Sequence, residues 1–267
     1  MISPFSKPRP IVPHSLTLPR PKRLPKRKVA MTLVAAFRSA EGGILLCADR
    51  EENDAWSSAK RSVDKIYPIH LLPCHLYLAG SGPTPAIIKA NELIHNSLSE
   101  AFAKGADVLC EFKTLIEACL QCVHTQFPDD LTDMPMNLIV IVQARTPNTV
   151  PLLYYTDRSI MFPENYYCAY GSGKVISDYF SDRLYEYPKL DKPNLMAVAV
   201  FIFREAHKSR SGVGEDVDMR FLYSGTLSRQ EIGPESVKEI QAGIPSLSET
   251  FWEYWKLNAK LPSWTAK

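Results

Sequence analysis

Residues 31–49 read MTLVAAFRSAEGGILLCAD, two apolar runs on either side of a short polar turn. The runs 32–38 and 43–49 are rich in aliphatic residues, and the turn contains two glycines, so the stretch predicts a tightly connected pair of strands. The first run begins at Thr32. As an internal residue Thr32 is an ordinary strand residue. As the first residue of the mature chain it would carry a hydroxyl nucleophile and an amine base together.

The rest of the sequence continues with strands in adjacent runs and helices in adjacent pairs. A Rossmann-type fold would instead alternate strand and helix. The order fits an α+β protein in which two antiparallel sheets pack face to face and a helix pair covers each, a four-layer αββα sandwich. The expected strands are 61–69, 75–79, 137–143, 151–156, 166–169 and 217–223, and the expected helices are 86–102, 108–123, 173–185, 195–208 and a surface helix within 246–257.

Composition narrows the class of protein. No apolar run reaches the ~18 residues that a membrane-spanning helix needs, and the N-terminus lacks the apolar segment of a signal peptide. The six cysteines lie mostly in apolar segments, which is typical of reduced thiols in a cytoplasmic protein. The pair Cys119 and Cys122 lies on an expected helix without a second ligand pair, so it predicts core packing and not a metal site. The sequence implies no metal and no cofactor.

Charge is distributed unevenly along the chain. Residues 1–30 contain eight Lys or Arg, seven Pro and no acidic residue, so we expect a disordered leader. This leader is a basic tail, an organelle-targeting segment, or upstream sequence that the mature chain lacks. The body, residues 31–267, has 23 basic and 29 acidic residues and is expected to form one domain. An acidic body gives no support for nucleic-acid binding.

One pair of charged residues stands out in the first strands. Asp49 ends an apolar strand, and Lys65 lies within the next extended stretch, SVDKIYPI at 62–69. An aspartate and a lysine on neighbouring strands would pair. A lysine held in its charged form by a carboxylate would lower the pKa of a nearby amine. Most such pairs are structural, so the pair alone leaves the function open.

The ordered set MTLVAAF, GILLCAD, SVDKIYPI, LYLAGSGP and YGSG resembles the proteasome β-subunit family and its bacterial relative HslV, over about residues 31–225. The resemblance implies the αββα fold of N-terminal-nucleophile hydrolases. It implies that Thr32 attacks a peptide carbonyl, that its α-amine is the base, and that Asp49 and Lys65 assist it. The unperturbed pKa of such an amine is about 7.7–8.0.

The same resemblance assigns further positions. Gly82 would supply a backbone N–H to the oxyanion, because a glycine allows close approach of the substrate. Ser172 and Ser211 match two serines that hold the nucleophile and its water. Taken singly, Ser172 is equally typical of a helix N-cap. No serine, histidine and aspartate occur in the order of a conventional triad.

The resemblance also implies a specificity pocket and partners. Gly80 would form the pocket floor, with Val63 and Tyr67 as walls. The substrate would be a peptide or protein, and the chain would assemble into a homo-oligomeric ring with a possible ATPase partner.

Three features depart from the family pattern. Met31 precedes Thr32 where a glycine is expected, and a chain that starts at Met31 and loses this initiator methionine would resolve the difference. The turn between Thr32 and Asp49 is longer than is usual in the family, so Met31 and Thr32 compete for the nucleophile's position. Lys208 stands where an aspartate is expected, and Glu215 or Asp216 would have to replace it. Three functions therefore remain open: a threonine-type peptidase, a subunit without catalysis that has a structural or binding role, and an amidase for a small amide.

Overall fold

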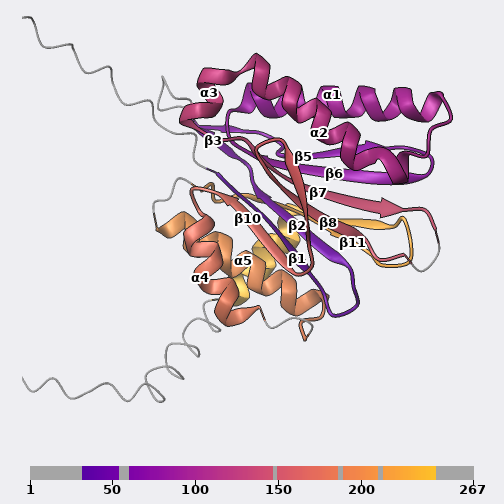
Figure 1. Cartoon of the computed structure of the whole chain (residues 1–267). Helices are drawn as coiled ribbons and strands as arrows, with labels where there is room; N and C mark the ends of the chain where they lie inside the picture. Colours follow the sequence, from indigo (N-terminus) through magenta and orange to yellow (C-terminus); the bar gives the residue numbers. More distant parts are fainter. Residues whose placement is uncertain (1–31, 54–59, 147–148, 186–188, 210–212, 245–267) are drawn as a thin grey trace, which may run out of the picture.

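The chain folds as two antiparallel five-stranded sheets packed face to face, with helices on both outer faces (Figure 1). The computed structural model describes residues 32–53, 60–146, 149–185, 189–209 and 213–244. The predicted α+β class and four-layer αββα sandwich are confirmed. The leader 1–30, Met31 and the expected helix within 246–257 lie outside the described residues.

The first sheet contains the strand pair that begins the body. β1 and β2 are joined by the predicted turn and pair in the register Val34 with Ala48. β1 also pairs with β10, and β2 pairs with β11, so both strands are central in this sheet. The order is β10 (Tyr167–Gly171), β1 (Leu33–Arg38), β2 (Ile44–Asp49), β11 (Val217–Leu222) and β12 (Arg229–Ile232).

The second sheet is a meander in which each strand pairs with its successor in the sequence. Its strands are β5 (Ile66–His70), β6 (Cys74–Ser81), β7 (Asn137–Ala144), β8 (Leu152–Asp157) and β9 (Ile160–Glu164). A separate two-stranded ribbon of β3 (Glu51–Asn53) and β4 (Lys60–Ser62) connects the sheets.

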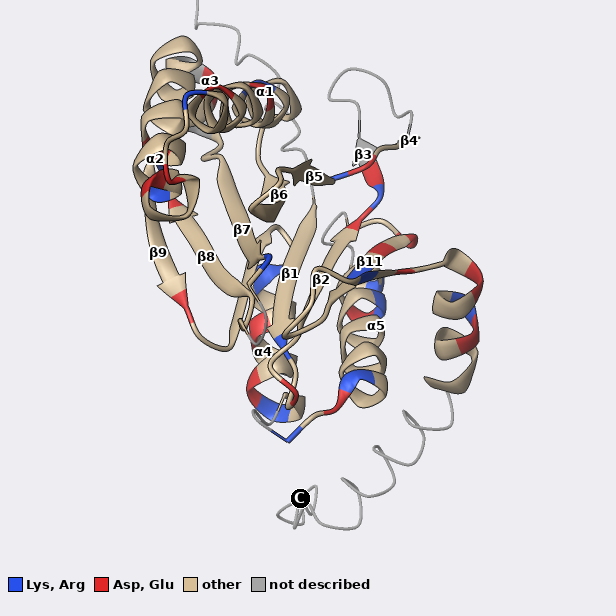
Figure 2. Cartoon of the chain, turned by 90° about the vertical axis from the view of Figure 1, so that its right-hand side faces the viewer, with Lys and Arg blue, Asp and Glu red and all other residues tan. Residues whose placement is uncertain are grey.

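Two groups of helices form the outer layers. α1 and α2 cover the second sheet, and α4 and α5 cover the first (Figure 1). The strands between them carry few charged residues, which gather on the helices and loops (Figure 2). The helices are α1 (Thr84–Ala103), α2 (Val108–Gln126), the short α3 (Pro128–Asp133), α4 (Lys174–Leu184) and α5 (Lys192–Lys208), and residues 234–244 are also helical.

The position of β1 inside the sandwich explains why its sequence is apolar throughout. Leu33, Ala35 and Phe37 pack toward α5, whereas Val34 and Ala36 face the other sheet. Successive side chains of a strand point to opposite faces, and here both faces are covered. The sandwich consequently has three apolar layers, one between the sheets and one under each helix pair.

The structure differs from the sequence prediction at the sheet edges. The expected strand 61–69 is divided into β4 and β5. The strands β9 and β12 and the helical residues 234–244 were not predicted, because IMFPE contains a proline and RQEI is mostly polar. Among the described residues, no helix is long and apolar enough to cross a membrane.

Candidate active site

Thr32 lies directly before β1 and is almost completely buried, with 5% of its surface exposed. Its hydroxyl donates to Asp49 Oδ1 at 2.6 Å and accepts from Lys65 Nζ at 2.7 Å. The Oγ1 atom is therefore held between a carboxylate and an ammonium group. A positive charge at this distance would stabilise negative charge that develops on the oxygen.

Asp49, at the end of β2, is fully buried and accepts four hydrogen bonds. Oδ1 accepts from the Thr32 hydroxyl, from the Leu33 N–H at 2.8 Å and from Lys65 Nζ at 2.9 Å. Oδ2 accepts from the Gly214 N–H at 2.9 Å. A buried carboxylate needs such partners, because removal from water strongly disfavours its charged form. Asp49 thus fixes both the side chain of Thr32 and the start of β1.

Lys65 lies three residues after the end of β4 and directly before β5. Only 12% of its side chain is exposed. Its third hydrogen bond goes to the Glu51 carbonyl at 2.6 Å, so all three ammonium protons have acceptors. The structure thereby brings the expected pair of Asp49 and Lys65 into contact, and places both against Thr32. The role of Glu51 was not predicted, because a backbone carbonyl leaves no signal in the sequence.

Glycines shape the backbone around Thr32. Gly171 has φ +109°, and a Cβ there would lie 2.0 Å from the Thr32 carbonyl oxygen. That oxygen accepts from the Gly173 N–H at 3.4 Å. A Cβ at Gly214 would lie 2.3 Å from Glu51 Cβ. These contacts require glycine on steric grounds. The GSG motif at 171–173 indicated the first of the two positions, and no motif in the sequence indicated Gly214.

The two expected serines differ in what the structure describes. Ser172 Oγ donates to the Thr32 carbonyl at 3.4 Å, so it contacts the backbone of Thr32. Ser211 lies outside the described residues. Lys208, at the end of α5, pairs with Glu205 at 3.0 Å. Glu215 and Asp216 are exposed and follow Gly214, whose backbone N–H, not a carboxylate, contacts Asp49.

The two glycines expected to bind substrate lie at the end of β6. Gly82 has φ +135°, and a Cβ there would be 2.8 Å from Met136 Cα, so other residues would clash. The space beside Gly80 is filled, since a Cβ there would lie 2.7 Å from Ile87 Cγ2 of α1. Ile87 is buried. Ile87 thus occupies the space that a side chain at position 80 would need, and the sequence did not indicate this packing.

The expected pocket walls lie on either side of Lys65 in sequence. The Val63 N–H donates to the Arg50 carbonyl at 2.8 Å, and its side chain is half-buried. Tyr67 is half-buried and packs against the apolar layer under α1 and α2, where Gly80 also faces.

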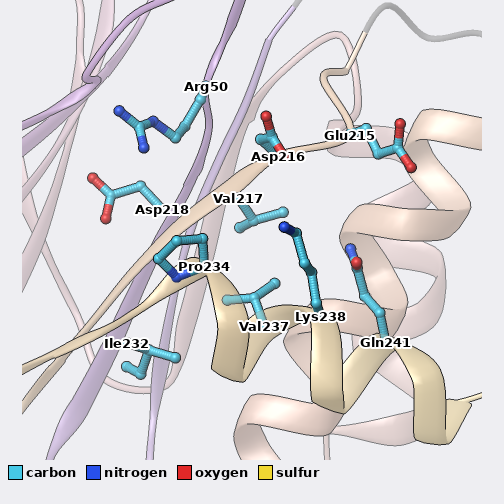
Figure 3. A pocket seen from close by; sticks show the side chains of 10 residues that line it. All are labelled: Arg50, Glu215, Asp216, Val217, Asp218, Ile232, Pro234, Val237, Lys238 and Gln241. Carbon is cyan, nitrogen blue, oxygen red and sulfur yellow. The ribbon is translucent and has the colours of Figure 1, made fainter.

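A polar hollow of about 240 Å³ is lined by residues that neighbour the site in sequence (Figure 3). Arg50 follows Asp49, and Glu215 follows Gly214, so the chain segments that carry Asp49 and Gly214 continue into the wall of this hollow. Burial raises the pKa of Asp218, while the nearby Arg220 and Arg50 lower it. Its lining residues are Arg50, Glu215, Asp216, Val217, Asp218, Ile232, Pro234, Val237, Lys238 and Gln241.

The architecture is a proteasome-like αββα fold. Similar solved structures are Anbu proteins. Anbu (ancestral beta-subunit) from Yersinia bercovieri has a TM-score of 0.70 at 15% identity, covering 88% of this chain and 100% of that chain. Anbu from Hyphomicrobium sp. strain MC1 has a TM-score of 0.68 at 16% identity with the same coverage. The helical assembly of the Anbu complex from Pseudomonas aeruginosa has a TM-score of 0.68 at 15% identity, covering 88% of this chain and 100% of that chain.

These findings correct the family named from the sequence. The assignment to proteasome β-subunits and HslV was wrong, because the structural neighbours are Anbu proteins, which carry a distinct family name. At this level of identity the likeness establishes the fold alone. No family model matches the sequence, and no curated protein matches it.

Proposed function

We propose that this protein is a threonine-type hydrolase that cleaves amide bonds of peptides with Thr32 as an N-terminal nucleophile. The observation that carries the proposal is the contact of Thr32 Oγ1 with Lys65 Nζ at 2.7 Å and Asp49 Oδ1 at 2.6 Å. A buried hydroxyl held between two charged groups is typical of an activated nucleophile.

The reaction would follow from these contacts. Thr32 Oγ1 attacks the amide carbon, and the hydroxyl proton passes to the free α-amine of Thr32, directly or through water. The C–N bond breaks, the leaving amine takes that proton, and an ester on Thr32 remains. Water then hydrolyses the ester and restores the hydroxyl. Lys65 stabilises negative charge on Oγ1 throughout. The Gly82 N–H is our candidate for the donor that hydrogen-bonds to the oxyanion.

The chemistry requires Thr32 to be the first residue. In the sequence as given, its nitrogen forms an amide with Met31 and is not basic. A mature chain that starts at Met31 and loses this methionine would expose the amine. The proposal needs neither a metal nor an organic cofactor.

The proposal includes a homo-oligomeric, cytoplasmic protein that acts on peptides or proteins, with an ATPase as a possible partner. A solved structure with this fold is a helical assembly, which supports an oligomer for this chain. Gly80, Val63 and Tyr67 remain our candidates for the substrate pocket. Because Ile87 fills the space beside Gly80, we expect a shallow pocket.

The test combines intact mass with turnover. We expect a mass that begins at Thr32, hydrolysis of fluorogenic peptide amides, and loss of turnover in Thr32→Ala but not in Thr32→Ser. Thr125→Ala, which removes an exposed hydroxyl on α2, is the matched control. Unchanged turnover in Thr32→Ala would exclude Thr32 as the nucleophile.

A second candidate is a subunit without catalysis. It is favoured by Lys208 in place of the expected aspartate and by the burial of Thr32. A threonine-directed electrophile separates the two. Covalent labelling of Thr32 supports the hydrolase, and a mass that retains Met31 without labelling supports the second candidate. If labelling occurs but no peptide is cleaved, a screen of small non-peptide amides tests the amidase.

A further inference from the structure

The polar hollow of Figure 3 does not include the residues that hold Thr32. Neither Asp49 nor Lys65 is among its lining residues. Its volume is about 240 Å³, whereas pockets for drug-sized ligands measure roughly 300–1,000 Å³. The hollow therefore suits a ligand that is smaller than a drug molecule.

One wall of the hollow carries two exposed carboxylates. They belong to Glu215 and Asp216, and neither has an ion-pair partner within the part of the chain that the structure describes. Asp218, in the same wall, differs because Arg220 pairs with it at 3.4 Å. The carboxylates of Glu215 and Asp216 are consequently available to a ligand with a positive charge.

The opposite wall carries hydrogen-bond donors. The side chains of Lys238 and Gln241 extend from the helical residues 234–244 toward the segment that carries Asp216 (Figure 3). Lys238 pairs with Glu235 at 3.3 Å, but both side chains are exposed, and such a pair contributes little. A negatively charged ligand can therefore replace Glu235 at Lys238. No ion pair joins Lys238 to Asp216 among the described residues, which leaves space between the two charges.

Between these walls the lining is apolar. Val217, Ile232 and Val237 are buried and belong to the apolar layer under α5. Pro234 lies beside them in the lining. Apolar surface of this kind favours contact with a hydrocarbon group, because the contact removes both surfaces from water.

The mixture of charges excludes two simpler classes of ligand. A metal ion is disfavoured because Lys238 and Arg50 line the hollow, and no group of three or more His, Cys, Asp or Glu in the described ranges could hold one. A phosphate is disfavoured by the negative charges of Glu215, Asp216 and Asp218. A small ligand with one charge of each sign and a hydrocarbon group matches the whole lining.

We propose that this hollow binds a free α-amino acid with an aliphatic side chain. The α-ammonium group donates to the carboxylates of Asp216 and Glu215, and the α-carboxylate accepts from Lys238 and Gln241. The side chain packs on Val237. The two charged groups of an α-amino acid are attached to one carbon, so the ligand fits between opposite charges across a small hollow. Hydrogen bonds between charged groups are the strong ones, and both ends of the ligand form them.

The first experiment measures binding to the full chain by titration calorimetry with L-leucine, without any substrate. We expect saturable binding of one leucine per chain. L-leucinamide lacks the carboxylate and N-acetyl-L-leucine lacks the ammonium group, so each should bind about tenfold more weakly or worse. Glycine retains both charges without the hydrocarbon group, and it should also bind more weakly than leucine.

The second experiment changes each wall separately. Asp216→Asn removes a charge but keeps the backbone carbonyl that accepts from the Arg50 N–H. Lys238→Gln removes the charge of the other wall. Each variant should raise the dissociation constant of leucine about tenfold. The matched controls are Asp182→Asn on α4 and Lys104→Gln after α1, which change exposed charges outside the hollow and should leave binding unchanged.

The outcomes decide for or against the amino acid. Absence of saturable leucine binding by the unchanged protein would overturn the proposal, as would equally tight binding of leucinamide or N-acetyl-leucine. Unchanged affinity in both wall variants would place the ligand elsewhere and also overturn it. Equal midpoints of urea denaturation show that the variants are folded. Because heat of binding and not turnover is measured, these failures are distinguishable from failure of the proposed hydrolase.

Discussion

The two ends of the sandwich both hold polar networks, but the networks differ in charge. At the Thr32 end, Asp49 and Lys65 form a buried ion pair at 2.9 Å around one hydroxyl. At the opposite end, the neutral amide of Gln143 is buried and donates to the carbonyls of Tyr223 at 2.9 Å and Thr226 at 2.5 Å. Gln143 holds the loop 223–228 in place, and the groups to which it donates are backbone carbonyls.

This difference indicates which end carries chemistry. A neutral amide fastens a loop without the cost of moving charges out of water. A buried ion pair incurs that cost, and replacing it with apolar residues is often neutral or stabilising. Its presence at Thr32 is therefore weak evidence for stability and better evidence for function.

The largest effect is expected for Asp49→Ala. It leaves the N–H groups of Leu33 and Gly214 without an acceptor and Lys65 without its counter-charge. We expect a loss of roughly 3–5 kcal/mol in the free energy of unfolding, measured by urea denaturation, together with loss of turnover. Asp49→Asn retains the shape and part of the hydrogen bonding and should lose turnover with a smaller loss of stability. Full turnover in Asp49→Asn would contradict a catalytic role of the charge.

The second effect concerns the backbone that holds Thr32. Gly171→Ala combines a positive φ with a Cβ 2.0 Å from the Thr32 carbonyl oxygen. We expect it to destabilise the protein by roughly 3 kcal/mol, because the backbone must shift. Gly105→Ala is the matched control, since Gly105 also has positive φ but no atom lies within 4 Å of its added Cβ. That variant should lose only about 1 kcal/mol. Equal losses in thermal or urea unfolding would mean that strain, and not the contact with Thr32, explains Gly171.

The strands β1 and β2 and the pair of Asp49 and Lys65 could be predicted from the sequence, because each depends on a pattern within a short stretch of residues. β1 and β2 are apolar on both faces and joined by a glycine turn, so their pattern has one interpretation. The edge strands β9 and β12 lack that pattern, because packing in the sandwich and not local propensity makes them strands.

The parts of the site that were missed are contacts between distant backbone atoms. Gly214 donates to Asp49 across 165 residues. The Glu51 carbonyl accepts from Lys65 because the fold places its backbone there, and the identity of its side chain has no part in this contact. Gly80 was the expected pocket floor from the resemblance, and only the structure shows Ile87 beside it.

A smaller effect is expected for Gln143→Met at the opposite end. The change removes the donors to three carbonyls in the loop 223–228 while retaining the length of the side chain. Loss of these bonds should destabilise the protein by about 1–2 kcal/mol and leave turnover unchanged. Urea denaturation and peptide hydrolysis on the same sample provide both values. A loss of turnover without a loss of stability would mean that the two ends are coupled.

The smallest effect is a pH dependence at the opposite end. Burial and the nearby Arg229 and Arg220 lower the pKa of His70, whose Nε2 accepts a hydrogen bond from Arg229 at 2.6 Å. Burial also lowers the pKa of His75, followed by the charges of His70, Arg229 and Arg145. A histidine with a lowered pKa in the folded state binds more protons when unfolded, so stability decreases as the pH falls through about 6.5.

Urea denaturation at pH 7.5 and 5.5 measures this decrease. His70→Gln should reduce it, because glutamine cannot take up a proton but retains an acceptor for Arg229. His95→Gln, on the exposed side of α1 and away from Arg229, is the matched control and should leave the decrease unchanged. An equal decrease in His70→Gln and the unchanged protein would assign the pH dependence to groups other than His70, with His75 the first to substitute in the same way.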